Sequence, residues 1–106
     1  MDGAKVNDPG KIAGIERSPL WPAAEKAWLK DHPVCAVTGG KDNLNVHHIK
    51  PYHLFPELEL DPTNFITLSR EAHLIFGHLD EWASYNENVI ADCAIWREKI
   101  LNRPKQ

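Results

Sequence analysis

A chain of 106 residues, 42% hydrophobic and 25% charged, has the size and composition of one small globular domain with a small core. Its net charge of -3 excludes a protein that coats nucleic acid through a basic excess, but not a catalyst centred on one metal ion. Since no apolar run approaches the roughly 20 residues of a membrane span and no signal-peptide pattern opens the chain, we expect a cytoplasmic, intracellular protein.

The N-terminal third predicts an arm followed by a helix. Residues 1–16 contain three glycines and an Asp-Pro-Gly turn, which predict a flexible arm ahead of a single domain over residues 17–106. Ser18-Pro19 is typical of a helix start, and apolar residues recur at helical spacing until Asp31-His32-Pro33 ends the helix.

The middle of the chain predicts a hairpin, a long loop and a second helix. Two β-like runs, 34–38 and 44–49, flank a Gly-Gly and Asp-Asn turn and predict a β-hairpin. Residues 52–63 are long for a connection, and a short buried run over 65–68 follows them. Ser69 can cap a helix that runs to Gly77, and an apolar stripe predicts a last helix from Val89 to about Asn102.

Histidines carry the candidate chemistry. His47 and His48 are neighbours on a predicted strand, so their side chains point to opposite faces and should do different jobs. His73 and His78 are five residues apart, which on a straight α-helix places them about 140° apart, too far for one ion. A left-handed or unwound Gly77 would bring His78 back beside His73.

We therefore expect His47, His73 and His78 to bind one divalent ion, which could be Mg²⁺, Mn²⁺, Ni²⁺ or Zn²⁺. His48 would then be the general base that takes a proton from the attacking water. Asn64 would orient the site through its side-chain amide, although a loop-capping role fits this residue better when it is taken alone.

Three residues flank the site in sequence and are candidates to contact the backbone phosphates of a nucleic acid, namely Lys50, His53 and Arg70. The alternative for each is an ordinary solvated surface residue. Arg70 has the stronger case, because it lies in the first turn of the helix that carries His73.

Taken together, the motifs resemble the HNH endonucleases over roughly residues 20 to 80. They are Cys35-Ala-Val-Thr38-Gly39, Val46-His47-His48-Ile49-Lys50-Pro51, Asp61-Pro-Thr-Asn64-Phe-Ile-Thr-Leu68, His73 and Phe76-Gly77-His78. The resemblance implies an α+β fold, in which a ββα-metal finger (β-hairpin, long loop, helix) is flanked by an N-terminal and a C-terminal helix. It also implies hydrolysis of DNA phosphodiesters with a divalent ion. By motif position, His47 matches a metal ligand of the family and His48 matches its general base. Asn64 matches the asparagine that is the N of the name HNH, and His73 matches its final histidine. His78 is a further candidate for a metal ligand.

The chain departs from the many relatives that hold a structural zinc with two Cys-x-x-Cys pairs. The corresponding positions here are Cys35 with Thr38 and Ser69 with Ala72, so one thiol of four is present, too few for such a site. Packing from Trp21, Trp28, Trp82 and Trp96 would then have to replace the zinc, or the fold is only marginally stable.

Two other functions stay open. A catalytically degenerate HNH-fold module could bind DNA or a protein partner, and a small structural protein could use the histidines only to hold a metal. A partner protein could also deliver DNA to so small and acidic a chain.

Overall fold

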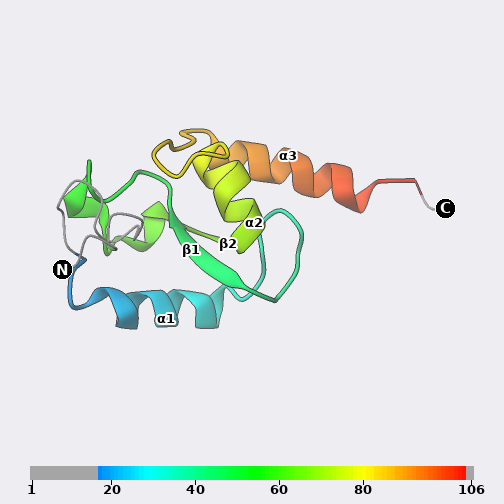
Figure 1. The fold of residues 1–106 in the computed structure, drawn as a ribbon. Helices are drawn as coiled ribbons and strands as arrows, with labels where there is room; N and C mark the ends of the chain where they lie inside the picture. Colours follow the sequence, from blue (N-terminus) through cyan, green and yellow to red (C-terminus); the bar gives the residue numbers. More distant parts are fainter. Residues whose placement is uncertain (1–16, 105–106) are drawn as a thin grey trace.

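The computed structural model describes residues 17–104, so the flexible arm predicted for residues 1–16 lies outside the described residues. The described chain forms a small α+β domain with one two-stranded antiparallel sheet and three helices (Figure 1). In chain order, the elements are α1 Trp21–Asp31, β1 Leu44–His48, η3 Pro56–Leu58, η4 Pro62–Asn64, β2 Phe65–Ser69, α2 Arg70–Ala72, η5 His73–Gly77 and α3 Val89–Leu101.

The predicted hairpin between residues 34–38 and 44–49 is wrong. β1 pairs instead with β2, in a register that places Leu44 opposite Ser69 and His48 opposite Phe65. The long loop that we expected after the hairpin therefore joins the two paired strands, and the helix that follows β2 starts directly at Arg70.

Residues 34–38 form a turn because their backbone groups are satisfied locally. The Cys35 N–H donates to the Gly40 carbonyl at 2.8 Å, and the Gly39 N–H donates to the Cys35 carbonyl at 2.8 Å. Gly39 has φ +74°, a left-handed conformation that glycine adopts without steric cost. A bond of 2.9 Å from the Ala36 N–H to the Thr67 carbonyl ties this turn to β2.

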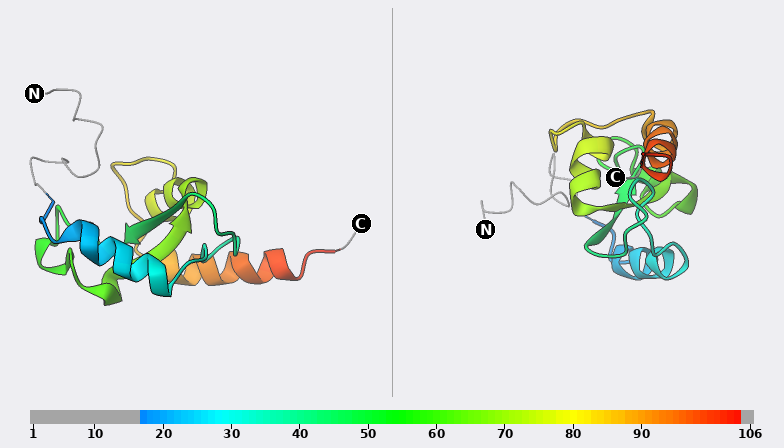
Figure 2. Two further views of the ribbon diagram at one scale, coloured as in Figure 1. Left: turned by 90° about the horizontal axis from the view of Figure 1, so that it is seen from below. Right: turned by 90° about the vertical axis from the view of Figure 1, so that its right-hand side faces the viewer.

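Two hydrophobic clusters cover opposite faces of the sheet. On one face, α1 contributes Trp21, which packs with Val46 and Phe65. On the other face, the helices after β2 pack against Leu68 in the larger cluster. In the right-hand view of Figure 2, α1 lies below the sheet, and α2 and α3 lie above it. The alternation of side chains along β1 therefore directs His48 towards α1 and His47 towards η5.

The four tryptophans contribute unequally to this packing. Trp21 is 7% exposed, and Trp28 donates its indole N–H to Thr67 Oγ1 at 2.9 Å. Trp96, one of the four tryptophans whose packing would have to replace the zinc, is 49% exposed instead. The reason is that α3 projects beyond the sheet and buries only Val89 and Cys93 near its start.

Candidate metal centre

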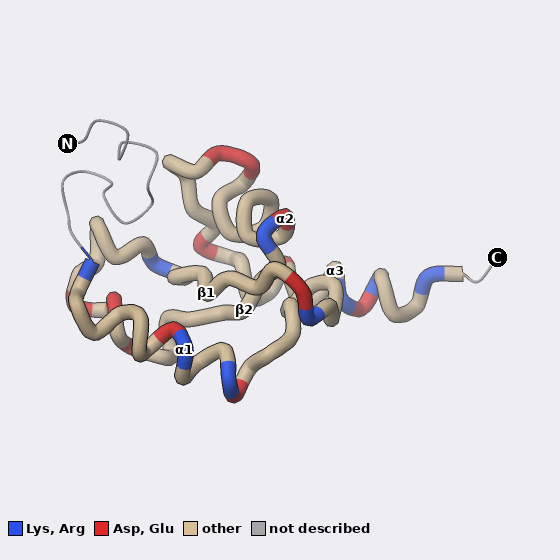
Figure 3. The backbone as a smooth tube through the Cα atoms, turned by 60° about the horizontal axis from the view of Figure 1, so that its bottom comes forward, with Lys and Arg blue, Asp and Glu red and all other residues tan. Residues whose placement is uncertain are grey.

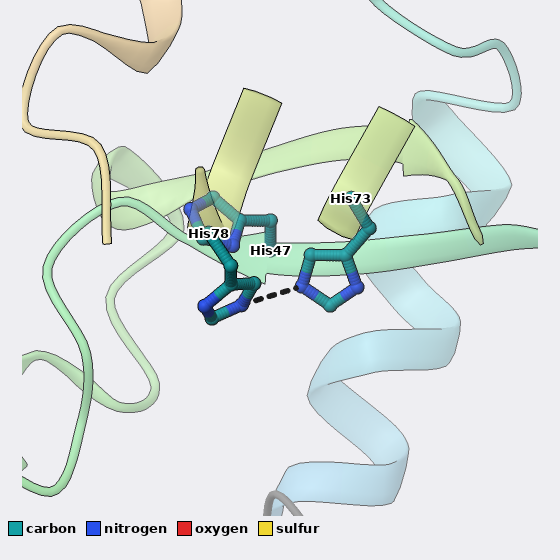
Figure 4. Close-up of side chains that lie close together, drawn as sticks. All are labelled: His47, His73 and His78. Carbon is teal, nitrogen blue, oxygen red and sulfur yellow. Dashed lines mark hydrogen bonds between the residues drawn. The ribbon is translucent and has the colours of Figure 1, made fainter. Parts of the chain in front are cut away.

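Three imidazole rings meet between the sheet and the helical segment that follows it (Figure 4). His47 comes from β1, His73 opens η5, and His78 follows it directly. Their ring centroids lie 4.8 to 5.0 Å apart, and one nitrogen from each ring lies within 4.8 Å of the others. The structure thus brings together the three residues that we expected to be metal ligands.

A wide helical turn places His73 and His78 side by side. The segment His73–Gly77 is a π-helix, in which the backbone bonds from i to i+5, so residues five apart face one direction. His73 Nε2 lies 3.2 Å from His78 Nε2. The predicted helix distortion is therefore present, but a left-handed Gly77 is not its cause, because Gly39 is the glycine with positive φ among the described residues.

Gly77 has a different role, which is to let β1 approach the helix. A Cβ atom at this position would lie 2.8 Å from both Cε1 and Nδ1 of His47, closer than carbon and these ring atoms can pack. The His47 ring therefore rests against the backbone of η5. Any side chain larger than hydrogen would push it away.

Hydrogen bonds fix the tautomers of two of the rings. Nδ1–H of His78 donates to the Ser84 carbonyl at 2.7 Å. Nδ1–H of His73 donates to Asn45 Oδ1 at 3.2 Å, and the Asn45 amide is oriented by its own bond from Nδ2 to the Leu44 carbonyl. Both bonds leave the Nε2 lone pairs free, which is how neighbouring groups commonly orient histidine ligands in metal sites.

The resulting arrangement fits a cation. Two Nε2 lone pairs face one another at 3.2 Å, close to the roughly 3.3 Å between two nitrogen ligands of one tetrahedral zinc ion. His47 is 1% exposed, and neither of its ring nitrogens has a hydrogen-bond partner among the described residues. Buried nitrogens without partners are costly, and a bound ion would satisfy one of them.

The electrostatics of the centre favour neutral rings, the form that binds metals. Burial, reinforced by the neighbouring imidazoles, lowers the pKa of His47 to about 2 and that of His73 to about 3. Burial also lowers the pKa of His78, opposed by its bond to the Ser84 carbonyl. At neutral pH no proton therefore competes for these nitrogens.

His48 lies on the opposite face of β1 but lines the same cavity as the three rings. Its Nε2–H donates to the Glu59 carbonyl at 2.8 Å, which leaves Nδ1 unprotonated and able to accept a proton. The centre of its ring lies 4.6 Å from the centre of the Trp21 ring, and His48 is 7% exposed. Its pKa is lowered, mainly by burial, with a contribution from the positive charge of Arg17.

Asn64 acts on the backbone in this structure. Its Oδ1 accepts from the Lys50 N–H at 2.8 Å, and its Nδ2 donates to the Lys50 carbonyl at 2.9 Å. These two bonds join the start of the long loop to its end, just before β2. The amide thereby holds the chain beyond His48 in place without lining the cavity.

The three candidate phosphate contacts lie in different places. His53 lines the cavity over the three rings. Arg70 is exposed and lines a neighbouring groove beside His73, with its guanidinium carbon 6.0 Å from the centre of the Trp82 ring. Lys50 is also exposed, and its ammonium group lies 5.4 Å from the Phe55 ring, outside both cavities.

Sequence reasoning missed four residues of this site. Asn45 could have been found, because it lies two residues before His47 on the same face of a strand. Arg17 gives no signal in the sequence beyond its positive charge, although it lines the cavity that His48 also lines. Ser84 acts through its carbonyl, which leaves no signal in the side chain. Trp82 was expected in the core, yet it packs against two of the imidazoles. The centre of its ring lies 5.1 Å from that of His73 and 4.9 Å from that of His78.

A scan against protein-family models found no match to this chain, and searches of curated proteins and of solved structures found none either. Among the described residues, no helix combines the length and apolar character needed to cross a bilayer.

Proposed function

We propose that this protein is a metal-dependent endonuclease of the HNH type that hydrolyses DNA phosphodiester bonds inside the cell. The observation that carries the proposal is the sharing of one cavity by three neutral imidazoles and a fourth histidine with a free nitrogen. The order of elements also supports it, since two antiparallel strands with a long loop between them lead directly into the helical segment of His73.

Each histidine has a separate task in this mechanism. His47, His73 and His78 would hold the divalent ion through their free nitrogens. When bound, that ion would polarise the scissile phosphate and offset the charge on the leaving oxygen. His48 Nδ1 accepts a proton from the attacking water, while the bond from Nε2–H to the Glu59 carbonyl holds the ring in the required tautomer. His53, on the wall of the same cavity, is placed to contact a substrate phosphate.

The test is plasmid cleavage by the tag-free protein in Mg²⁺, Mn²⁺, Ni²⁺ and Zn²⁺, run beside His48→Ala. The parent is expected to nick or cut DNA with at least one of these ions. The variant should lose at least about a hundredfold in rate, as expected for removal of a general base, while it binds the metal as the parent does. His48→Ala cleaving as fast as the parent would contradict the assignment of the base.

A second function is favoured by one observation, the charge of the surface. Lys and Arg positions are interspersed with Asp and Glu along the described chain, and the net charge is -3 (Figure 3). A surface of this kind attracts duplex DNA weakly. A non-catalytic module that holds a metal and binds a protein partner would show metal binding without cleavage in the same experiment.

A further inference from the structure

A second cavity opens beside the metal centre, between α1 and Trp82. It has a volume of about 240 Å³, and its walls include Arg17, Arg70 and Trp82. His73 lines both this groove and the cavity over the three rings, as do Arg17 and Trp82. A molecule whose phosphodiester lies at the metal centre would therefore extend into the groove.

Two guanidinium groups line this groove, against one carboxylate, that of Glu25. Arg17 is held between two aromatic rings, with its guanidinium carbon 4.7 Å from the centre of Trp21 and 4.5 Å from that of Tyr52. Its Nη1 is buried and has no hydrogen-bond partner among the described residues, so the protein leaves part of this cation's hydrogen-bonding capacity unused. Arg70 projects from the first turn of α2. Guanidinium groups pair well with phosphates, which neutralise them.

Trp82 supplies an aromatic surface between the two cavities. The centre of its ring lies 5.1 Å from that of His73, edge to face, and 4.9 Å from that of His78, and the side chain is only partly buried. An indole next to cationic groups is the combination by which proteins hold unpaired bases, since every base has a face that can stack. Bases inside a duplex are already stacked on their neighbours and cannot enter such a groove without being turned out.

We propose that this groove binds one unpaired nucleotide of single-stranded DNA next to the phosphodiester that is cleaved. Trp82 stacks on its base, and Arg17 and Arg70 contact its phosphates. The inference rests on the proposed function, in which a DNA phosphodiester is cleaved at the metal centre. It narrows the substrate to single-stranded or locally unpaired DNA.

The test measures binding without metal, by fluorescence anisotropy of a labelled short oligothymidylate and of a hairpin duplex. The full-length, tag-free parent is expected to bind the single strand more tightly. Trp82→Leu and Arg17→Gln should each weaken that binding about tenfold, the scale of one lost stacking contact or one lost ionic contact. Matched controls are Trp96→Leu and Arg103→Gln, which change exposed residues that do not line the groove. Their affinity for the single strand should stay within about twofold of that of the parent.

A second substitution guards against a structural explanation. Trp82→Phe keeps an aromatic face and should recover most of the binding that Trp82→Leu loses, while both variants should unfold at similar temperatures. Equal binding of single strand and duplex, or groove variants that bind like the controls, would overturn the inference, even if the protein cleaves plasmid DNA. Groove-dependent binding by a protein that cuts neither form of DNA would instead overturn the proposed function.

Discussion

At the scale of single residues, the tautomers of the histidines determine what the centre can bind. Ser84 and Asn45 each accept a hydrogen bond from Nδ1 of one ring, so the Nε2 atoms of His78 and His73 present lone pairs to each other. Two lone pairs at 3.2 Å repel unless a cation lies near them. A cation bound between the two rings would remove this repulsion.

Asn45 gives a direct test of this orienting effect. Asn45→Leu removes the acceptor for His73 Nδ1–H, so the ring can adopt the other tautomer or rotate. Metal affinity, measured by isothermal titration with Ni²⁺, is expected to fall between about tenfold and a hundredfold. Asn45→Asp keeps an acceptor at the same place and should retain the parent's affinity. Equal affinities for all three proteins would show that Asn45 does not orient the ligand.

At the scale of elements, the site depends on how closely β1 approaches η5. The widened turn brings His73 and His78 together, and Gly77 leaves room for the His47 ring against the helical backbone. Neither feature is local to one residue, because each requires the strand and the helix to be packed at a defined distance.

Gly77→Ala tests that distance. Replacing glycine in a helical segment by alanine ordinarily stabilises a protein by about 0.4 to 1 kcal/mol. Here the new Cβ would lie 2.8 Å from two atoms of His47, and overpacking of this kind costs about 1 to 3 kcal/mol. We therefore expect a lower urea midpoint and weaker Ni²⁺ binding.

Gly40→Ala is the matched control for this substitution, because the added Cβ would meet one exposed hydroxyl, that of Thr38, at 3.2 Å. Its Ni²⁺ affinity should equal that of the parent. Gly77→Ala with the parent's stability and metal affinity would mean that β1 does not need this close approach.

The elements also show what sequence patterns could and could not predict. Helical spacing of apolar residues identified α1 and α3, although α1 fully buries only Trp21 and α3 only Val89 and Cys93. The partner of β1 was predicted wrongly, since a β-like run over 34–38 carries no information on whether a strand elsewhere pairs better. The three ligands were identifiable by residue type, but the π-helical turn and the clearance at Gly77 arise from packing between elements and leave no periodicity in the sequence.

At the scale of the whole molecule, burial of neutral histidines couples folding to pH. The pKa of His47 is about 2 and that of His73 about 3 in the folded protein, against about 6.5 in an unfolded chain. Between these values the unfolded state binds more protons, so the free energy of unfolding falls as pH decreases.

We therefore expect the free energy of unfolding to be highest above pH 6.5. Below that pH it should fall by about 1.4 kcal/mol per pH unit for each proton taken up on unfolding. Urea unfolding of the metal-free protein at pH 7.5, 6 and 5 measures the effect in a window where carboxylates stay ionised. His47→Leu should reduce the slope. A midpoint that does not change between pH 7.5 and 5 would show that the histidines are not buried in neutral form.

Titration of the tag-free protein with Ni²⁺ measures whether residues 47, 73 and 78 together bind one cation. We expect one ion per chain, a bound ion that raises the unfolding temperature, and a large loss of affinity in His47→Ala, His73→Ala and His78→Ala. His32→Ala, which changes an exposed histidine stacked on Trp28, should bind like the parent. A parent that binds no ion, or three variants that bind as tightly as His32→Ala, would show that these three histidines do not form a metal site.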